Sequence, residues 1–282
     1  MTDCKVLLFR FAVDDFVFQF DQETIDKLSA FVERSNLHNL SIGEVFQSLS
    51  RFTDSGTGLI QANGFSSWLK TLPERMRPSD HRLLQSIFTC FDRSESGVVD
   101  CVELACGLSV LCHGSKSDKL AFAFDSMDDD GDSFLTKRGL WRYFRAFLSV
   151  LITLSGAFDE LDIVEQMTIL DDSSVWTAAM ILESTSARMH EISGVSFEEI
   201  ADWYSTAGHT QATWLELLDL KKWVHYYGKP LESEEDDSEA AVDSSRNYED
   251  PSELQFNLPI GDAGDELLIY ESDAKSVRDT FM

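Results

Sequence analysis

The sequence has few basic residues and no long apolar run. Lys and Arg together number 23 among 282 residues, against 50 Asp and Glu, and the formal net charge is -27. Such an acidic surface repels nucleic acid and anionic membranes, so we expect neither as a partner. The apolar run from Phe147 to Leu154 is too short to cross a bilayer. We therefore expect no integral membrane segment.

Cysteine is also scarce, and its spacing does not suggest a zinc site. The number is odd and the positions do not form close pairs. They are Cys4, Cys90, Cys101, Cys106 and Cys112. We expect reduced thiols in a cytoplasmic protein. Arg10 interrupts the early apolar run, so we expect no secretory signal. Thr2 excludes N-terminal myristoylation, because that modification requires glycine after the initiator.

Motifs of the common enzyme classes are missing as well. The sequence has no Gly-rich phosphate loop ending in Gly-Lys-Ser/Thr, no His-Glu-x-x-His metal helix and no Gly-x-Ser-x-Gly nucleophile turn. Its six histidines are scattered and need no role beyond packing or surface. Paired-acid catalysis is the weaker use of the many carboxylates. We expect a binding protein and not an enzyme.

What the sequence does contain is a stretch, Asp92 to Glu103, that places oxygen atoms at the spacing of a helix-loop-helix calcium site. Calcium takes six to eight oxygen ligands, and such a loop supplies them from positions 1, 3, 5, 7, 9 and 12. Gly97 stands at the sixth position, where the backbone turns sharply, and Glu103 can close the shell with both oxygens. The expected ligands are Asp92, Ser94, Ser96, the Val98 carbonyl, Asp100 and Glu103.

A second acidic loop follows but is incomplete. Gly139 stands where the bidentate Glu belongs, and Ser133 replaces the turn glycine. The loop therefore loses a charged ligand and some backbone freedom, and we expect weak or absent calcium binding there, with Mg²⁺ as an alternative cation. Its candidate ligands are Asp128, Asp130, Asp132, Phe134 and Thr136.

Two further loops are poor in acidic ligands: the first has no carboxylate at a ligand position, and the last has Glu199 at position 12 but none in its first half. One starts at Thr53 and keeps the turn glycine Gly58, and the other, starting at Arg188, is visible mainly from its exit at 194–200. The four loops, in order, form two pairs, and paired loops face each other through a short two-stranded ribbon. We expect Ile60 opposite Val99 and Leu135 opposite Val195.

Residues from about 40 to 207 thus resemble the EF-hand superfamily, which includes calmodulin, calcineurin B and the neuronal calcium sensors. The resemblance implies a mainly α fold of two paired EF-hand lobes with short two-stranded loop ribbons, and calcium-dependent binding. We divide the chain into an N-terminal extension, a first pair, a second pair with an insertion and closing helix, and an acidic tail expected to be disordered. The corresponding ranges are 1–39, 40–114, 115–228 and 229–282.

Several segments outside the loops allow more than one interpretation. Residues 6–20 are either a hairpin or a strand-to-helix lead-in, and 23–34 is a helix. The insertion at 155–174 is either a solvated connector or a lid, followed by an entering helix over 175–189. A closing helix over 214–227 either packs on the second pair or occupies its target groove. In the tail, the apolar patches around Leu254–Leu258 and Glu266–Tyr270 are either weakly ordered or docking strands.

The functional expectation is a calcium sensor that binds a target protein. Calcium would neutralise repulsion among Asp92, Asp100 and Glu103, and the helix pair would open and expose an apolar groove. The acidic chain favours a basic or amphipathic helix as the partner. The alternatives are a constitutive scaffold or regulatory subunit with a structural calcium ion, and a regulatory module for a phosphatase, protease or channel.

Overall fold

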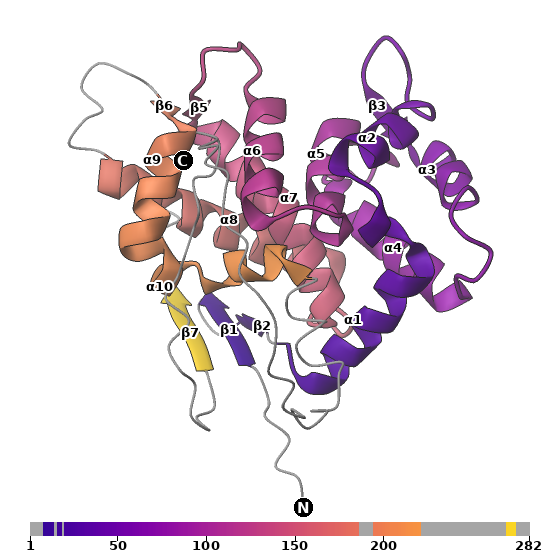
Figure 1. Ribbon diagram of the computed structural model, residues 1–282, viewed down its shortest axis with the longest axis horizontal. Helices are drawn as coiled ribbons and strands as arrows, with labels where there is room; N and C mark the ends of the chain where they lie inside the picture. Colours follow the sequence, from indigo (N-terminus) through magenta and orange to yellow (C-terminus); the bar gives the residue numbers. More distant parts are fainter. Residues whose placement is uncertain (1–7, 14–15, 19, 186–193, 221–268, 275–282) are drawn as a thin grey trace, which may run out of the picture.

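Helices dominate the structure, and three small sheets accompany them (Figure 1). The computed structural model describes residues 8–13, 16–18, 20–185, 194–220 and 269–274. Two of the sheets are antiparallel ribbons between loops, as expected for paired EF-hands. The predicted mainly α fold class with short loop ribbons is therefore confirmed.

The first pair of hands is built from helices whose ends are fixed by polar side chains. Ser41 and Glu44 form a capping box at the start of α2, and the Asp100 carboxylate accepts hydrogen bonds from two amides at the start of α5. Such caps satisfy amides that have no partner within the helix. The elements are α2 (Ile42–Ser50), β3 (Leu59–Gln61), α3 (Ala62–Leu69), α4 (Pro78–Phe91), β4 (Val98–Asp100), α5 (Cys101–Leu108) and the 3₁₀ turn η2 (Ser109–Leu111).

The second pair repeats this plan with longer helices. Ser115 and Ser196 open their helices with capping boxes, and Thr136 caps the long central helix. The elements are α6 (Lys116–Met127), β5 (Leu135–Thr136), α7 (Lys137–Ser155), α8 (Ile163–Thr185), β6 (Gly194–Val195), α9 (Phe197–Trp203), the π-helical η3 (Tyr204–Gly208), α10 (His209–Gln211) and the 3₁₀ segment η4 (Thr213–Leu218).

The ribbons have the register that the loop spacing predicts. Ile60 pairs with Val99 in the first ribbon, and Leu135 pairs with Val195 in the second. All four side chains are buried, so each ribbon also contributes to the core. The prediction of both pairings is confirmed.

Helix α7 joins the two pairs into one hydrophobic core. It packs against α8 in its own half and against α4 and α5 of the first pair, and it lies at the centre of the molecule (Figure 1). At its crossing with α5, Gly107 approaches so closely that a Cβ there would meet the Ala146 carbonyl oxygen at 2.6 Å. The buried core is continuous from α1 to η4.

The insertion between the third and fourth loops is mostly helix, which differs from the expected connector or lid. The Asp162 carboxylate accepts hydrogen bonds from the amides of Val164 and Glu165 and so starts α8 twelve residues before the expected helix at 175. Leu170 within the insertion is fully buried. The helix ends at Thr185, so the last residues of the expected helix lie outside the described residues.

Two segments from opposite parts of the sequence pair in the third sheet. β1 (Leu8–Val13) pairs antiparallel with β2 (Phe16–Phe18), so the hairpin interpretation of the N-terminal segment is confirmed. β7 (Ile269–Ala274) pairs in parallel with β1 (Figure 1). A segment of the tail, for which composition indicates disorder, thus forms a strand, because a free strand edge offers backbone partners to a short run that begins with β-favouring residues. The patch at 254–258 lies outside the described residues.

Two helices outside the hands complete the fold. α1 (Gln22–Ser35), predicted over 23–34, begins at an Asp21 cap and is followed by the 3₁₀ turn η1 (Leu37–Asn39). The closing segment η4 is buried against the second pair as a 3₁₀ helix and not the predicted α-helix, and residues 221–227 lie outside the described part. Trp214 of η4 is fully buried with its ring edge-on to Phe144.

Two lysines of α6 anchor the closing segment. Lys116 forms an ion pair with Glu216, which also accepts a hydrogen bond from the Tyr204 hydroxyl. The Lys119 ammonium donates to the carbonyl oxygens of Val110 at 3.0 Å and Leu218 at 2.6 Å. Burial lowers the pKa of Lys119 to about 8, so η4 is held to α6 through a buried titratable group.

Lys119 should make stability depend on pH. Its pKa is below that of an unfolded lysine, so between pH 8 and 10 the unfolded chain binds more protons and stability rises with pH. We expect the free energy of unfolding of the wild type, relative to Lys119→Met, to increase by about 2 kcal/mol from pH 8 to pH 10. Urea unfolding of both proteins at several pH values measures this. A difference that is constant or falls with pH would contradict the assignment.

Candidate metal centre

The front half of the loop from Asp92 has the shape of a metal-binding turn. The Asp92 carboxylate accepts hydrogen bonds from the amides of Ser96 at 2.9 Å and Gly97 at 2.6 Å. Gly97 has φ 73°, the left-handed conformation that glycine adopts without strain. The hydroxyls of Ser94 and Ser96 lie 2.9 Å apart, and Ser96 also approaches Asp92. The predicted ligands at positions 1, 3 and 5 are therefore brought together.

The back half of the same loop is organised differently from the prediction. Val98 lies in β4, and the Asp100 carboxylate caps α5 by accepting from the amides of Val102 at 2.8 Å and Glu103 at 3.1 Å. Glu103 is on α5 and buried. These elements hold the backbone of positions 7, 9 and 12 beside the turn.

Glu103 is paired with two arginines, which the sequence analysis did not foresee. Arg93, at loop position 2, reaches both oxygens of Glu103 through Nη2, and Arg142 of α7 donates from Nε at 2.7 Å. The expected repulsion among Asp92, Asp100 and Glu103 is therefore already compensated at Glu103. Arg93 was visible within the loop, but the sequence gives no signal for Arg142, because the crossing of α7 over α5 places it there.

The residues present fit a calcium ion on condition that Glu103 leaves Arg93 and Arg142 and contacts the metal. Asp92, Ser94 and Ser96 offer a preformed group of oxygens, and Gly97 provides the turn. When bound, calcium would supply the positive charge that the two guanidinium groups now provide to Glu103. The ligand set of this loop stays a prediction.

The three aspartates of the other acidic loop lie close together. Carboxylate oxygens of Asp128, Asp130 and Asp132 lie within 4.8 Å of one another, the only such group of possible metal ligands that the described residues form. A hydrogen bond from the Asp132 amide lowers the pKa of Asp130, but the neighbouring charges of Asp132 and Asp128 outweigh it, so the pKa is raised. This repulsion is what a cation would relieve.

The rest of that loop offers fewer ligands. Thr136 uses its hydroxyl to accept from the Gly139 amide and cap α7, and the Phe134 amide donates to Asp132. Gly139 brings no carboxylate at position 12, and Ser133 has φ 68°, where glycine would be unstrained. The carboxylates of the loop from Asp128 thus lie closer together than those of the loop from Asp92, although the sequence predicts weaker binding for it. Metal binding by the loop from Asp128 also stays a prediction.

The loop from Thr53 is stabilised by a residue that the sequence analysis missed. The Asp54 carboxylate accepts hydrogen bonds from the amides of Gly56 and Thr57 and from the Thr57 hydroxyl. Gly58 has φ 68°, as its turn position requires. Because Asp54 stands at loop position 2, which supplies no ligand, the ligand spacing gives no signal for it. The first half of the fourth loop lies outside the described residues.

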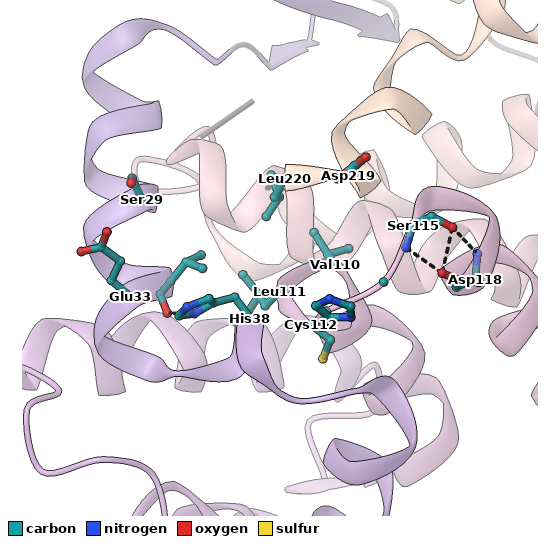
Figure 2. A pocket seen from close by; sticks show the side chains of 13 residues that line it. Ser29, Glu33, His38, Val110, Leu111, Cys112, Ser115, Asp118, Asp219 and Leu220 are labelled. Carbon is teal, nitrogen blue, oxygen red and sulfur yellow. Dashed lines mark hydrogen bonds between the residues drawn. The ribbon is translucent and has the colours of Figure 1, made fainter. Parts of the chain in front are cut away.

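A cavity of about 420 Å³ lies between α1, the turn after α5 and the end of η4 (Figure 2). Its apolar wall includes Val110, Leu111 and Leu220. Among the described residues that line it, three are carboxylates, Glu33, Asp118 and Asp219, and none is Lys or Arg. An apolar wall with an acidic edge is suited to a cationic, amphipathic ligand.

Several known proteins are similar to part of this chain. Calcium-binding protein NCSA of Dictyostelium discoideum is 29% identical over 105 residues, which is 37% of this chain and 52% of that protein. Guanylyl cyclase inhibitory protein of Lithobates pipiens is 28% identical over 99 residues, 35% of this chain and 47% of that protein. The resemblance to EF-hand calcium-binding proteins is confirmed. The chain spans about half the length of these relatives.

Other similarities are shorter relative to the proteins concerned. Calaxin of Bos taurus is 30% identical over 63 residues, 22% of this chain and 30% of calaxin. Lysophosphatidylcholine acyltransferase 2 of Homo sapiens is 33% identical over 111 residues, 39% of this chain but only 19% of that protein. No protein-family model matches the chain. Among the described residues, no helix is both long and apolar enough to span a bilayer.

Proposed function

We propose that the protein is a calcium sensor that regulates a target protein. The observation that carries this is the loop from Asp92 to Glu103. Its preformed turn lies beside Glu103, a carboxylate on the exit helix α5 that is held by Arg93 and Arg142. Similarity to calcium-binding proteins supports it. Calcium would bind at Asp92, Ser94, Ser96, Val98, Asp100 and Glu103, with the aspartates of the next loop as a second, weaker site for Ca²⁺ or Mg²⁺.

Movement of Glu103 would be transmitted to the rest of the molecule. Glu103 belongs to α5, and α5 packs tightly on α7 at Gly107. When Glu103 leaves its arginines for the metal shell, α5 has to shift against a close-packed partner, which rearranges the shared core. Such a helix shift is how hands of this type open an apolar surface.

The proposed partner is a basic or amphipathic helix. The net charge of -27 favours a cationic ligand, and the acidic edge and apolar wall of the cavity in Figure 2 offer both contacts that such a helix needs. We also propose a cytoplasmic location, because the four described cysteines are buried and unpaired. We do not propose acyl transfer, since the similarity covers only 19% of lysophosphatidylcholine acyltransferase 2.

A constitutive scaffold or regulatory subunit with a structural calcium ion is the second candidate. It is compatible with the closed surface: within the described part of the chain, Val164 is the one large apolar side chain that is mostly exposed. A sensor in its metal-free form has the same closed surface. The two candidates therefore differ only in what calcium changes.

Fluorescence of an apolar dye separates the two functions. For a sensor, adding calcium to the metal-free protein should increase dye fluorescence severalfold, because apolar surface becomes exposed. The variant Glu103→Gln should lose this response, while Glu95→Gln, which removes an exposed carboxylate at a non-ligand position of the same loop, should keep it. Calcium binding without any dye response would favour the scaffold.

A further inference from the structure

Arg142 touches acidic residues of both acidic loops at once. Its Nε donates to Glu103 at 2.7 Å, its Nη1 donates to Asp129 at 2.8 Å, and its Nη2 lies 3.9 Å from Asp100. The side chains of Arg142 and Glu103 are only 14% and 8% exposed, so this contact is formed with little competition from water, whereas Asp129 is 76% exposed. The guanidinium fork of Arg142 therefore connects positions 9 and 12 of one loop with position 2 of the next.

Arg93 completes the arrangement from within the loop. Its Nη2 lies 3.0 Å and 3.2 Å from the two oxygens of Glu103, and its guanidinium lies over the ring of Trp141, 4.8 Å from the centroid. Trp141 and Arg142 are neighbours on α7. Helix α7 thus holds both arginines against Glu103, one directly and one through an aromatic stack.

We propose that Arg93 and Arg142 are affinity-setting residues that compete with calcium for Glu103, and that Arg142 couples the two acidic loops. This rests on the proposed calcium binding at the loop from Asp92. Both oxygens of Glu103 are engaged by guanidinium groups. Any bidentate contact of Glu103 with a metal must replace these charge-assisted hydrogen bonds. The free energy of the lost hydrogen bonds therefore reduces the apparent affinity for calcium.

The exchange is feasible because neither arginine would be left without a contact. When Glu103 leaves, Arg142 keeps Asp129, whose side chain is 76% exposed and free to follow it. Arg93, with a 36% exposed side chain, keeps Trp141 and gains solvent. Movement of Arg142 toward Asp129 would also change the charge beside the aspartates of the second acidic loop. Occupancy of one loop would in this way alter the cation affinity of the other.

The test is calorimetric calcium titration of the metal-free full chain and of two variants that each lose one positive charge. Arg142→Gln removes the competing contact, whereas Arg138→Gln removes the same charge from an exposed position one turn earlier on α7. We expect Arg142→Gln to bind calcium about tenfold more tightly than Arg138→Gln. A variant that merely damages the fold would bind more weakly, so the direction of the change distinguishes competition from a structural role.

Two further variants test whether a change in affinity results from misfolding. Arg93→Gln changes a more exposed side chain and should tighten binding in the same direction, and Arg142→Lys, which restores one charge without the fork, should return the affinity toward the wild type. Equal affinities of Arg142→Gln and Arg138→Gln, with calcium still bound, would overturn this proposal and leave the sensor intact. Absence of calcium binding in every variant would overturn the proposed function as well.

Discussion

Replacing Gly107 by alanine should destabilise the protein by about 2–3 kcal/mol, lowering Tm by roughly 4–8 °C. The added Cβ would lie 2.6 Å from the Ala146 carbonyl oxygen, 2.6 Å from Phe91 Cζ and 3.1 Å from a Val150 methyl group. The first of these is backbone, which cannot move aside without separating α5 from α7. Overpacking therefore exceeds the roughly 1 kcal/mol gain in helix propensity. Thermal and urea unfolding measure the change.

Gly43 provides the matched control. It lies on α2 with nothing within 4 Å of the position of an added Cβ. Gly43→Ala should be neutral or stabilise the protein by up to about 0.5 kcal/mol, because alanine restricts the unfolded chain more than glycine does. Equal effects of the two substitutions would show that α5 and α7 do not approach as closely as described.

The substitution Glu103→Gln should weaken calcium binding by about 100-fold or more. A sensor loop has a dissociation constant of roughly 0.1 to 10 micromolar, and loss of its bidentate carboxylate moves the site toward the millimolar range. The amide also removes the carboxylate that Arg93 and Arg142 share, although Arg142 keeps Asp129, so a lower Tm in the absence of calcium is expected. Calorimetric titration measures the affinity and thermal unfolding measures the stability.

Glu95→Gln controls for the loss of one negative charge in the loop. Glu95 is exposed at position 4 and contributes no expected ligand. Its substitution should change the affinity less than about threefold, through long-range charge alone. An equal loss of affinity in both variants would mean that Glu103 acts only through its charge and does not enter the metal shell.

The periodic features of the fold could be predicted from the sequence. The spacing of the four loops predicted which strands pair and in which register, because position 8 of each loop has a fixed place in the ribbon. Gly58 and Gly97 predicted left-handed turns, since other residues are strained there. Helix α1 was predicted from its apolar periodicity, and the structure adds the Asp21 cap at its start. The turns and α1 follow from local rules, whereas the ribbon register follows from the fixed place of position 8 in a paired loop.

The remaining features depend on contacts between distant segments. The start of α8 follows from the Asp162 cap. The insertion contains several acidic residues, so the sequence does not show which of them caps the helix. The position of η4 depends on two lysines of α6, which contact its Glu216 carboxylate and Leu218 carbonyl oxygen. The pairing of Glu103 with Arg142 joins residues 39 positions apart and arises from the α5 and α7 crossing. Local patterns contain no information about these partners.

Calorimetric titration of calcium into the metal-free wild-type protein tests the central claim most directly. We expect one clear site, at the weak end of the roughly 0.1 to 10 micromolar range because the neutral Ser94 and Ser96 occupy two ligand positions. A second and weaker phase would correspond to the loop of Asp128, Asp130 and Asp132. No heat together with no change in helix content by circular dichroism would contradict the account, and the hands would then serve only as architecture.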